Sequence, residues 1–240
     1  MNRTKVSLVL ALMTMLGLAV SPQTALAVTI APVADTYITE HSGLGGTTSN
    51  HGSDASLWII GTGSFRAAPL FRFDLGSFSG ETVLGDATLA LTVLATNSGE
   101  VSQSINAHSI LNSWIEGTVT WNSFGAPSPG SNISTLPLSN LTDATINPTD
   151  VLNFTIPQLT VQDWIDDPSN NFGVLLSSLT SSALNDVVVG SRESLSPPQL
   201  TFALQADPPV PPDPSAVPEP ATLALLALGL AGLAFRRKIK

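Results

Sequence analysis

Flat aromatic side chains are the residues of this 240-residue chain best suited to hold a sugar, because a pyranose ring stacks on an aromatic face. The chain has four Trp and one Tyr. Trp114 and Trp121 bracket one short block, and Arg72, on a predicted strand, has the charge to contact an acidic sugar. These three residues are the candidate glycan site. The alternative, favoured for all four Trp, is that each packs in or at the edge of the core, with its indole N–H bonded locally. Arg72 could likewise be structural, as part of a cross-strand ion pair with Asp74 in the sheet.

Acidic residues near both ends of the folded region suggest a second kind of site. Asp35 and Asp54 lie at early loop edges, and Glu193 lies in a late loop that a β-sandwich could bring close to them. Carboxylates are ligands that Ca²⁺ prefers, so Ca²⁺ is the one cofactor considered. The signal is weak because no contiguous calcium-loop motif is present. Solvated surface acids are the alternative to this calcium site. The block that holds Trp114 and Trp121 could likewise be a corner motif of the fold, in which Glu116 accepts hydrogen bonds from loop backbone N–H groups and not from a ligand.

No sequence motif points to catalysis. The nucleophile elbow, the zinc-protease helix, the phosphate loop and the dinucleotide fingerprint are all missing from the sequence. Carboxylates far apart in sequence can still meet in a β-fold and act as a glycosidase pair. We therefore predict a protein that is not an enzyme, and we keep a polysaccharide lyase or hydrolase as an alternative.

The charge of the central region excludes several partners. Residues 28–206 hold fifteen Asp and Glu against three Arg and no Lys, a net charge of −12, whereas the whole chain carries −9. Such a surface argues against nucleic acid and anionic lipid as partners. The chain has no Cys, so disulfides and thiol chemistry are excluded.

The two ends of the chain have the composition of targeting segments. Residues 1–27 carry a basic start, an apolar stretch and small residues at Ala25 and Ala27, which predicts a signal peptide cleaved before Val28. Residues 207–216 form a Pro-rich linker, which we expect to be extended. Residues 217–240 contain Pro218-Glu219-Pro220, a predicted transmembrane helix over about 221–235, and a basic end.

This last segment resembles the PEP-CTERM sorting signal of Gram-negative bacteria. The tripeptide Pro218-Glu219-Pro220, the apolar helix and the basic pair Arg236-Arg237 follow in the order of that signal. The resemblance implies a membrane protease of the exosortase type as partner. It also implies a transient anchor in the inner membrane, with the basic end on the cytoplasmic side.

The region between the targeting segments is predicted to be all-β, because short runs of Val, Ile, Leu, Phe and Thr alternate with Gly, Ser, Asn and Pro clusters. One helix is expected, with Pro157 as its first residue and Leu159, Val161, Trp164 and Ile165 on its apolar face. Trp121 is placed on a strand. The predicted strands cover residues 35–39, 55–60, 67–75, 86–96, 103–110, 172–177, 186–190 and 199–204, and a further strand ends near Ile156. Alternation places Phe71, Phe73 and Leu75 on the core face of one strand and Leu89, Leu91 and Val93 on one face of another.

Several blocks in this region resemble the secreted DNRLRE domains, which are similar to carbohydrate-binding modules. The blocks are Asp35-Thr36-Tyr37-Ile38, residues 52–59, residues 70–75, residues 114–122, Val161-Gln162-Asp163-Trp164, residues 170–176, Ser191-Arg192-Glu193 and Pro198-Gln199-Leu200. They follow in order across residues 28–206. The resemblance implies an antiparallel, jelly-roll-like β-sandwich that binds polysaccharide.

Together these observations predict an exported protein that reaches the cell surface or the extracellular matrix after sorting. Its predicted role is to bind or organise extracellular polysaccharide in a biofilm without catalysis. A purely structural or adhesive surface protein is the first alternative, since an acidic, stable domain could serve as a spacer without any glycan affinity.

Overall fold

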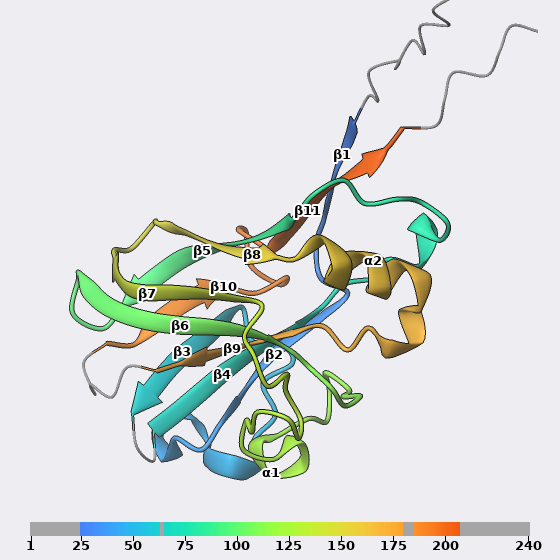
Figure 1. The fold of residues 1–240 in the computed structure, drawn as a ribbon. Coiled ribbons are helices and arrows are strands. Elements are labelled where there is room, and N and C mark those ends of the chain that lie inside the picture. Colours follow the sequence, from blue (N-terminus) through green and yellow to red (C-terminus); the bar gives the residue numbers. More distant parts are fainter. Residues whose placement is uncertain (1–24, 63–64, 180–184, 207–240) are drawn as a thin grey trace, which may run out of the picture. The chain divides into compact units, whose positions relative to one another are not determined.

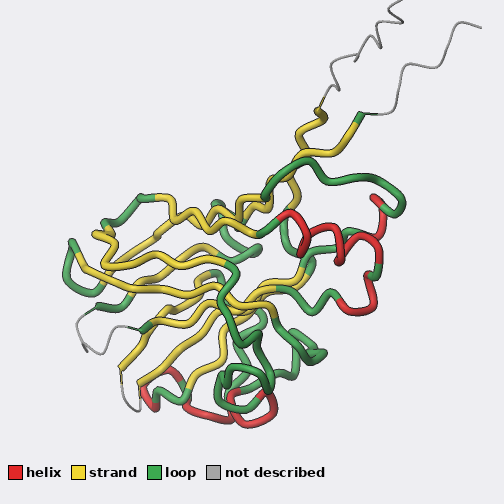
Figure 2. The backbone as a smooth tube through the Cα atoms, viewed as in Figure 1, coloured by secondary structure: helices red, strands yellow, loops and turns green. Residues whose placement is uncertain are grey.

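Eleven β-strands and two short α-helices make up the part of the chain that the computed structural model describes, residues 25–62, 65–179 and 185–206 (Figures 1 and 2). The strands are β1 Ala25–Ile30, β2 Ala34–Thr39, β3 Ser56–Thr62, β4 Phe65–Arg72, β5 Ala87–Thr96, β6 Val101–Ser109, β7 Ser139–Ile146, β8 Val151–Ile156, β9 Val174–Ser178, β10 Val187–Gly190 and β11 Gln199–Gln205. The helices are α1 Trp121–Phe124 and α2 Gln158–Asp166, and short 3₁₀ turns cover Ser42–Leu44, Gly46–Thr48, Gly76–Phe78 and Pro168–Asn170.

The strands form one curled antiparallel sheet. Along its main path the order is β1-β11-β5-β10-β3-β4-β9-β6-β7, while β2 pairs with β4 and β8 pairs with β5. Strand β3 connects the two halves of the sheet, because Ser56–Ile59 pair with β10 and Ile60–Thr62 pair with β4. Figure 1 shows the result: β5, β8 and β11 lie across the interior from β3, β4 and β9.

The main core fills the inside of the curl, and alternation along the strands explains its composition. Phe71 on β4 and Leu89, Leu91 and Val93 on β5 all point into it and are fully or almost fully buried. Phe73, just beyond β4, joins them. These positions confirm the inward face predicted for both segments.

A second core lies on the outer face of β2, β4 and β9. Leu70 and Leu175 are fully buried there, although they point away from the main core. Residues 110–138, here called the covering segment, lie over this face and contribute Ile110, Val119 and Ile133, among others, to the same cluster. Strand β2 is therefore buried at every position.

The covering segment corrects one sequence prediction. Trp121 is the first residue of α1 and does not lie on a strand. Thr120 takes an extended conformation, and its side chain accepts a hydrogen bond from the backbone N–H of Ser123. The Ser123 hydroxyl in turn accepts from the Thr120 N–H, so the two residues form a reciprocal capping box that starts a helix at this point.

Helix α2 agrees with the predicted helix in position but differs in two details. Pro157 is the residue that precedes the helix, not its first residue. Val161, Trp164 and Ile165 are buried as expected, whereas Leu159 is 75% exposed and lies outside the apolar face. A helical turn places Leu159 about 200° from Val161, which explains the difference.

The antiparallel, mainly β character predicted from the sequence is confirmed. The prediction missed β1, β7 and α1, and the described residues contain two helices where one was expected. In the described ranges, no helix combines the length and the apolar character needed to cross a bilayer. The predicted transmembrane helix at 221–235 and most of the predicted signal peptide lie outside those ranges.

Gly173, which precedes β9, offers a test of this packing. Its φ is +89°, and a Cβ built on it would lie 1.8 Å from the carbonyl oxygen of Phe71. Gly80 has nearly the same φ, +88°, with no atom within 4 Å of such a Cβ. We predict that Gly173→Ala lowers the free energy of unfolding by more than about 3 kcal/mol, and Gly80→Ala by only about 1 kcal/mol.

Urea unfolding of both variants measures the difference. Equal losses for the two would show that the close approach of residues 71 and 173 does not limit the side chain at this position.

Candidate functional site

Two arginine–tryptophan pairs fix the covering segment to β4. Arg66 and Arg72 both project from the outer face of β4, about 20 Å apart for six residues of strand. The guanidinium carbon of Arg72 lies 5.5 Å from the ring centre of Trp114, and that of Arg66 lies 4.9 Å from the ring centre of Trp121. Each arginine therefore covers the face of one tryptophan.

Burial of Trp114 and Trp121 limits the contacts that their rings can make with a sugar. Trp114 is 4% exposed and its indole N–H donates to the carbonyl of Phe172 at 2.8 Å, while Trp121 is 6% exposed. Neither ring offers a flat, open platform for a sugar. The alternative interpretation, that these residues pack in the core, describes their surroundings better. The other two tryptophans are likewise packed: Trp164 is buried and Trp58 is half-buried.

The three predicted glycan-binding residues do not lie together. Arg72 donates to the backbone carbonyl of Trp114 and lines a groove of about 300 Å³ that also contains Asp74 and Asn171. Trp121 lines a different cavity of about 330 Å³. The structure thus separates Arg72 and Trp114 from Trp121.

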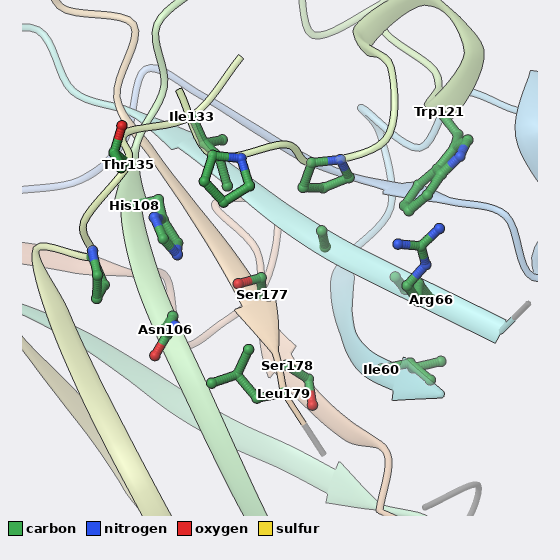
Figure 3. Close-up of a pocket in the computed structure, with 15 residues that line it drawn as sticks. Ile60, Arg66, Asn106, His108, Trp121, Ile133, Thr135, Ser177, Ser178 and Leu179 are labelled. Atoms are coloured by element: carbon green, nitrogen blue, oxygen red, sulfur yellow. The ribbon is translucent and has the colours of Figure 1, made fainter. Parts of the chain in front are cut away.

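The cavity beside Trp121, here called the pocket, lies between the outer face of the sheet and the covering segment (Figure 3). Its apolar wall combines aliphatic and proline side chains with an edge of Trp121. Polar side chains from β6 and β9 face the same space. The lining residues include Ile60, Ala68, Pro127, Pro129, Ile133, Pro137 and Leu179 on the apolar side, and Arg66, Asn106, His108, Thr135, Ser177 and Ser178 on the polar side.

The histidine in the pocket is held in its neutral form. His108 is 4% exposed, and its Nδ1 lies 3.0 Å from the Ser134 carbonyl, to which it donates. Burial lowers the pKa of His108 below its usual value, although the hydrogen bond to Ser134 acts in the opposite direction. A neutral ring that donates through Nδ1 has Nε2 left as an acceptor, which suits a hydroxyl group.

Arg66, by contrast, is already paired. Its Nε lies 2.5 Å from Oε1 of Glu40, and the pair sits at the rim with Arg66 43% and Glu40 18% exposed. The guanidinium therefore brings little uncompensated positive charge to the pocket.

A second constellation forms where three distant parts of the chain meet. Asp35, Glu116 and Glu193 are here called the acidic cluster. One carboxylate oxygen from each of the three lies within 4.8 Å of the other two. Arg192 is bound among them: its Nη2 and Nε donate to the two oxygens of Glu116 at 2.9 and 3.0 Å, and Nε lies 2.8 Å from Glu193 Oε1. Its backbone N–H donates to Asp35 Oδ2 at 2.7 Å.

Asp35 is the buried member of the cluster, 1% exposed. Burial raises its pKa to about 7, the hydrogen bond from the Arg192 backbone lowers it, and the nearby charges of Glu193 and Glu116 raise it. The Asp35 N–H donates to Glu116 Oε1 at 2.9 Å, so Glu116 does bond a backbone N–H group, as the alternative from the sequence proposed.

The structure brings together two of the three predicted calcium ligands and replaces the third. Asp54 lies elsewhere, with its Oδ2 2.9 Å from His51 Nδ1. Glu116 takes its place in the cluster. Sequence reasoning did not place Glu116 in this cluster, and it did not single out Arg66, Asn106 and His108 as neighbours in one pocket. Glu116 lies in the block 114–122 and Arg192 in the block Ser191-Arg192-Glu193, so the family resemblance could have indicated both residues.

The predicted sorting residues Pro218, Glu219, Pro220, Arg236 and Arg237 lie outside the described residues. So does most of the predicted signal peptide, although the cleavage-site residues Ala25 and Ala27 are exposed at the start of β1, opposite Gln205 and Ala203.

Comparisons with known families identify both parts of the chain. Residues 216–238 match the PEP-CTERM protein-sorting motif, which implies export and exosortase sorting to the cell surface. No curated protein gives a significant match. Residues 26–203 match the model of carbohydrate-binding module family 96, a class of domain that is typically non-catalytic. Because this match spans most of the described fold, the chain belongs to carbohydrate-binding module family 96 and carries a PEP-CTERM sorting motif.

Proposed function

We propose that this protein is exported, sorted by an exosortase, and then binds and organises extracellular polysaccharide in a biofilm matrix without catalysis. The pocket between β4, β6, β9 and the covering segment is the proposed binding site. The observation that carries this proposal is the two-sided wall of the pocket. An apolar side next to a row of hydroxyl, amide and imidazole groups matches the two surfaces of a sugar.

The polar side of the pocket has donors and acceptors suited to hydroxyl groups. Asn106 offers both from its amide, and neutral His108 offers an acceptor. Ser177 and Thr135 add hydroxyls. None of these four side chains carries a charge at neutral pH, so the pocket favours a neutral sugar over an acidic one.

The charges around the pocket support the same choice of ligand. Arg66, Arg72 and Arg192 are the only Lys or Arg residues between positions 28 and 206. Arg66 and Arg192 are paired with glutamates, and Arg72 shares its groove with Asp74. An acidic polysaccharide would meet a domain of net charge −12 in which Arg66 and Arg192 are bound to glutamates and Arg72 lies over Trp114.

The position of the ends of the domain suits display on a surface. β1 and β11 pair from Ala25 to Ile30, and their free ends lie at the top of Figure 1, while α1 lies at the bottom. Gln205, the end of β11, leads toward the linker and tail proposed for 207–216 and 217–240. The pocket beside α1 therefore lies at the far side of the domain from its point of attachment.

We further propose that the signal peptide covers residues 1–27 and that the folded domain covers 28–206. Cleavage before Val28 would leave Val28–Ile30 paired with Leu200–Phe202, so half of β1 would remain. The tail helix would hold the chain in the inner membrane until the exosortase acts. The fold would correspond to a jelly-roll-like sandwich whose halves are joined through β3.

Removing one polar group from the pocket tests the site. Asn106→Ala is expected to weaken binding of a neutral polysaccharide about 3- to 10-fold, because a hydrogen bond to the ligand is lost. Asn153→Ala is the matched control: Asn153 is a strand residue on β8 and lines a separate groove. Affinity-gel electrophoresis against soluble β-glucan, xylan and galactomannan measures both.

A filled pocket gives the complementary result. Ser177→Phe should abolish binding, whereas Thr201→Phe on the exposed face of β11 should leave it unchanged. Loss of affinity in the Asn153 or Thr201 variant instead would place the site elsewhere. If the unmodified protein bound no polysaccharide, the structural or adhesive alternative would be favoured. Release of reducing ends or unsaturated products would favour the lyase or hydrolase alternative.

The choice between neutral and acidic ligands has its own test. Because no ion pair with the ligand is expected, affinity for the neutral polysaccharide should change less than 2-fold between 50 and 500 mM NaCl. Alginate and polygalacturonate should bind at least about 10-fold more weakly. Tighter binding of these polyanions, with loss of affinity in salt and in Arg72→Ala, would show that the groove at Arg72 is the site.

A further inference from the structure

We propose that the acidic cluster of Asp35, Glu116 and Glu193 binds one Ca²⁺ ion, which fastens β2, the covering segment and the loop between β10 and β11 to one another. This inference is independent of the proposed glycan binding. It differs from the trio suggested by the sequence, since Asp54 has no part in it.

The spacing of the three side chains fits one ion. Their oxygens lie within 4.8 Å of one another, and two ligands on opposite sides of a Ca²⁺ ion, each at about 2.4 Å, are separated by about that distance. The residues come from widely separated positions: Asp35 and Glu116 are 81 residues apart, and Asp35 and Arg192 are 157 apart. An ion here would therefore close long loops.

A buried oxygen without a donor points to a missing ligand. Asp35 Oδ1 is inaccessible to solvent and has no hydrogen-bond partner among the described residues, although Oδ2 of the same group accepts from the Arg192 backbone. A buried acceptor left without a partner costs about 1–3 kcal/mol. A cation bonded to Oδ1 would remove this cost.

The charge of the cluster calls for a divalent ion. Three carboxylates and one guanidinium leave a net charge of −2 when Asp35 is ionised. Arg192 already occupies both oxygens of Glu116 and one of Glu193, so it cannot also serve Asp35 Oδ1. One divalent cation makes the group neutral without displacing that arginine.

The chemistry of the ligands selects Ca²⁺ among the common divalent ions. The group contains oxygen ligands alone, without the imidazole or thiolate that Zn²⁺ prefers. Mg²⁺ requires short bonds in near-ideal octahedral geometry, whereas Ca²⁺ accepts longer bonds and irregular geometry. Carboxylates held at different depths, from buried Asp35 to exposed Glu193, suit the more tolerant ion.

Calorimetric titration and thermal unfolding of the full chain with CaCl₂, compared with EDTA, test the site. Saturating Ca²⁺ is expected to raise Tm by about 5–10 °C, because the ion binds the folded chain alone. Asp35→Asn and Glu193→Gln should each remove most of this rise. Asp54→Asn, the matched control, should keep it. MgCl₂ should give less than half of the rise.

Glu193→Gln keeps the test decisive if Asp35→Asn does not fold, because Glu193 lies nearer the surface and its loss leaves β2 unchanged. Absence of a Tm rise and of binding heat in the unmodified protein would overturn the proposal. So would a rise that persists in Glu193→Gln, or equal effects of Ca²⁺ and Mg²⁺, which would indicate nonspecific binding to surface acids.

Discussion

Burial of both faces of β4 is the constraint on which the rest of the structure depends. The inner face carries Phe71 into the main core, and the outer face carries Leu70 into the second core. A sheet buried on one face alone would leave this outer row of apolar side chains in water, at about 25 cal/mol for each Å². The covering segment removes that cost, and the pocket exists only because this segment lies over the sheet.

The arginines show how a chain with few cations uses them. Arg66 and Arg72 each lie over a tryptophan of the covering segment, and Arg192 binds the glutamate that reaches β2 from the same segment. All three basic side chains of the domain thus hold this one segment in place. Arginines that hold the covering segment are less available to bind a polyanion, which links the packing of β4 to the neutral ligand proposed for the pocket.

How much could be predicted from the sequence depended on the range of the interactions. Alternation along 86–96 predicted both the strand and its inward face, since neighbouring residues set that pattern. Trp121 was placed on a strand because Val119 and the threonines beside it favour strands, whereas a local capping box starts a helix there. Leu159 was assigned to the apolar face together with Val161, Trp164 and Ile165, although its angular position on the helix places it on the exposed side.

The candidate sites were harder to predict for a physical reason. Glu116 meets Asp35 across 81 residues, and Asp35 meets Arg192 across 157. No local pattern encodes which of the fifteen acids will meet. The sequence gives no reason to prefer Glu116 to Asp54 as a member of the cluster, whereas the folded chain places Asp54 against His51. Family blocks were more informative, because Ser191-Arg192-Glu193 and residues 114–122 supply most of the cluster.

The covering segment also connects the acidic cluster with the pocket. Glu116 and Trp121 are five residues apart on it, and the side chain of Asn50 donates to the carbonyls of Glu116 and Val119 between them. Anything that fixes Glu116 against β2 therefore also restricts α1 and the wall of the pocket. An ion in the cluster would therefore act on the same segment that forms one wall of the pocket, although the two sites lie at different places on the domain.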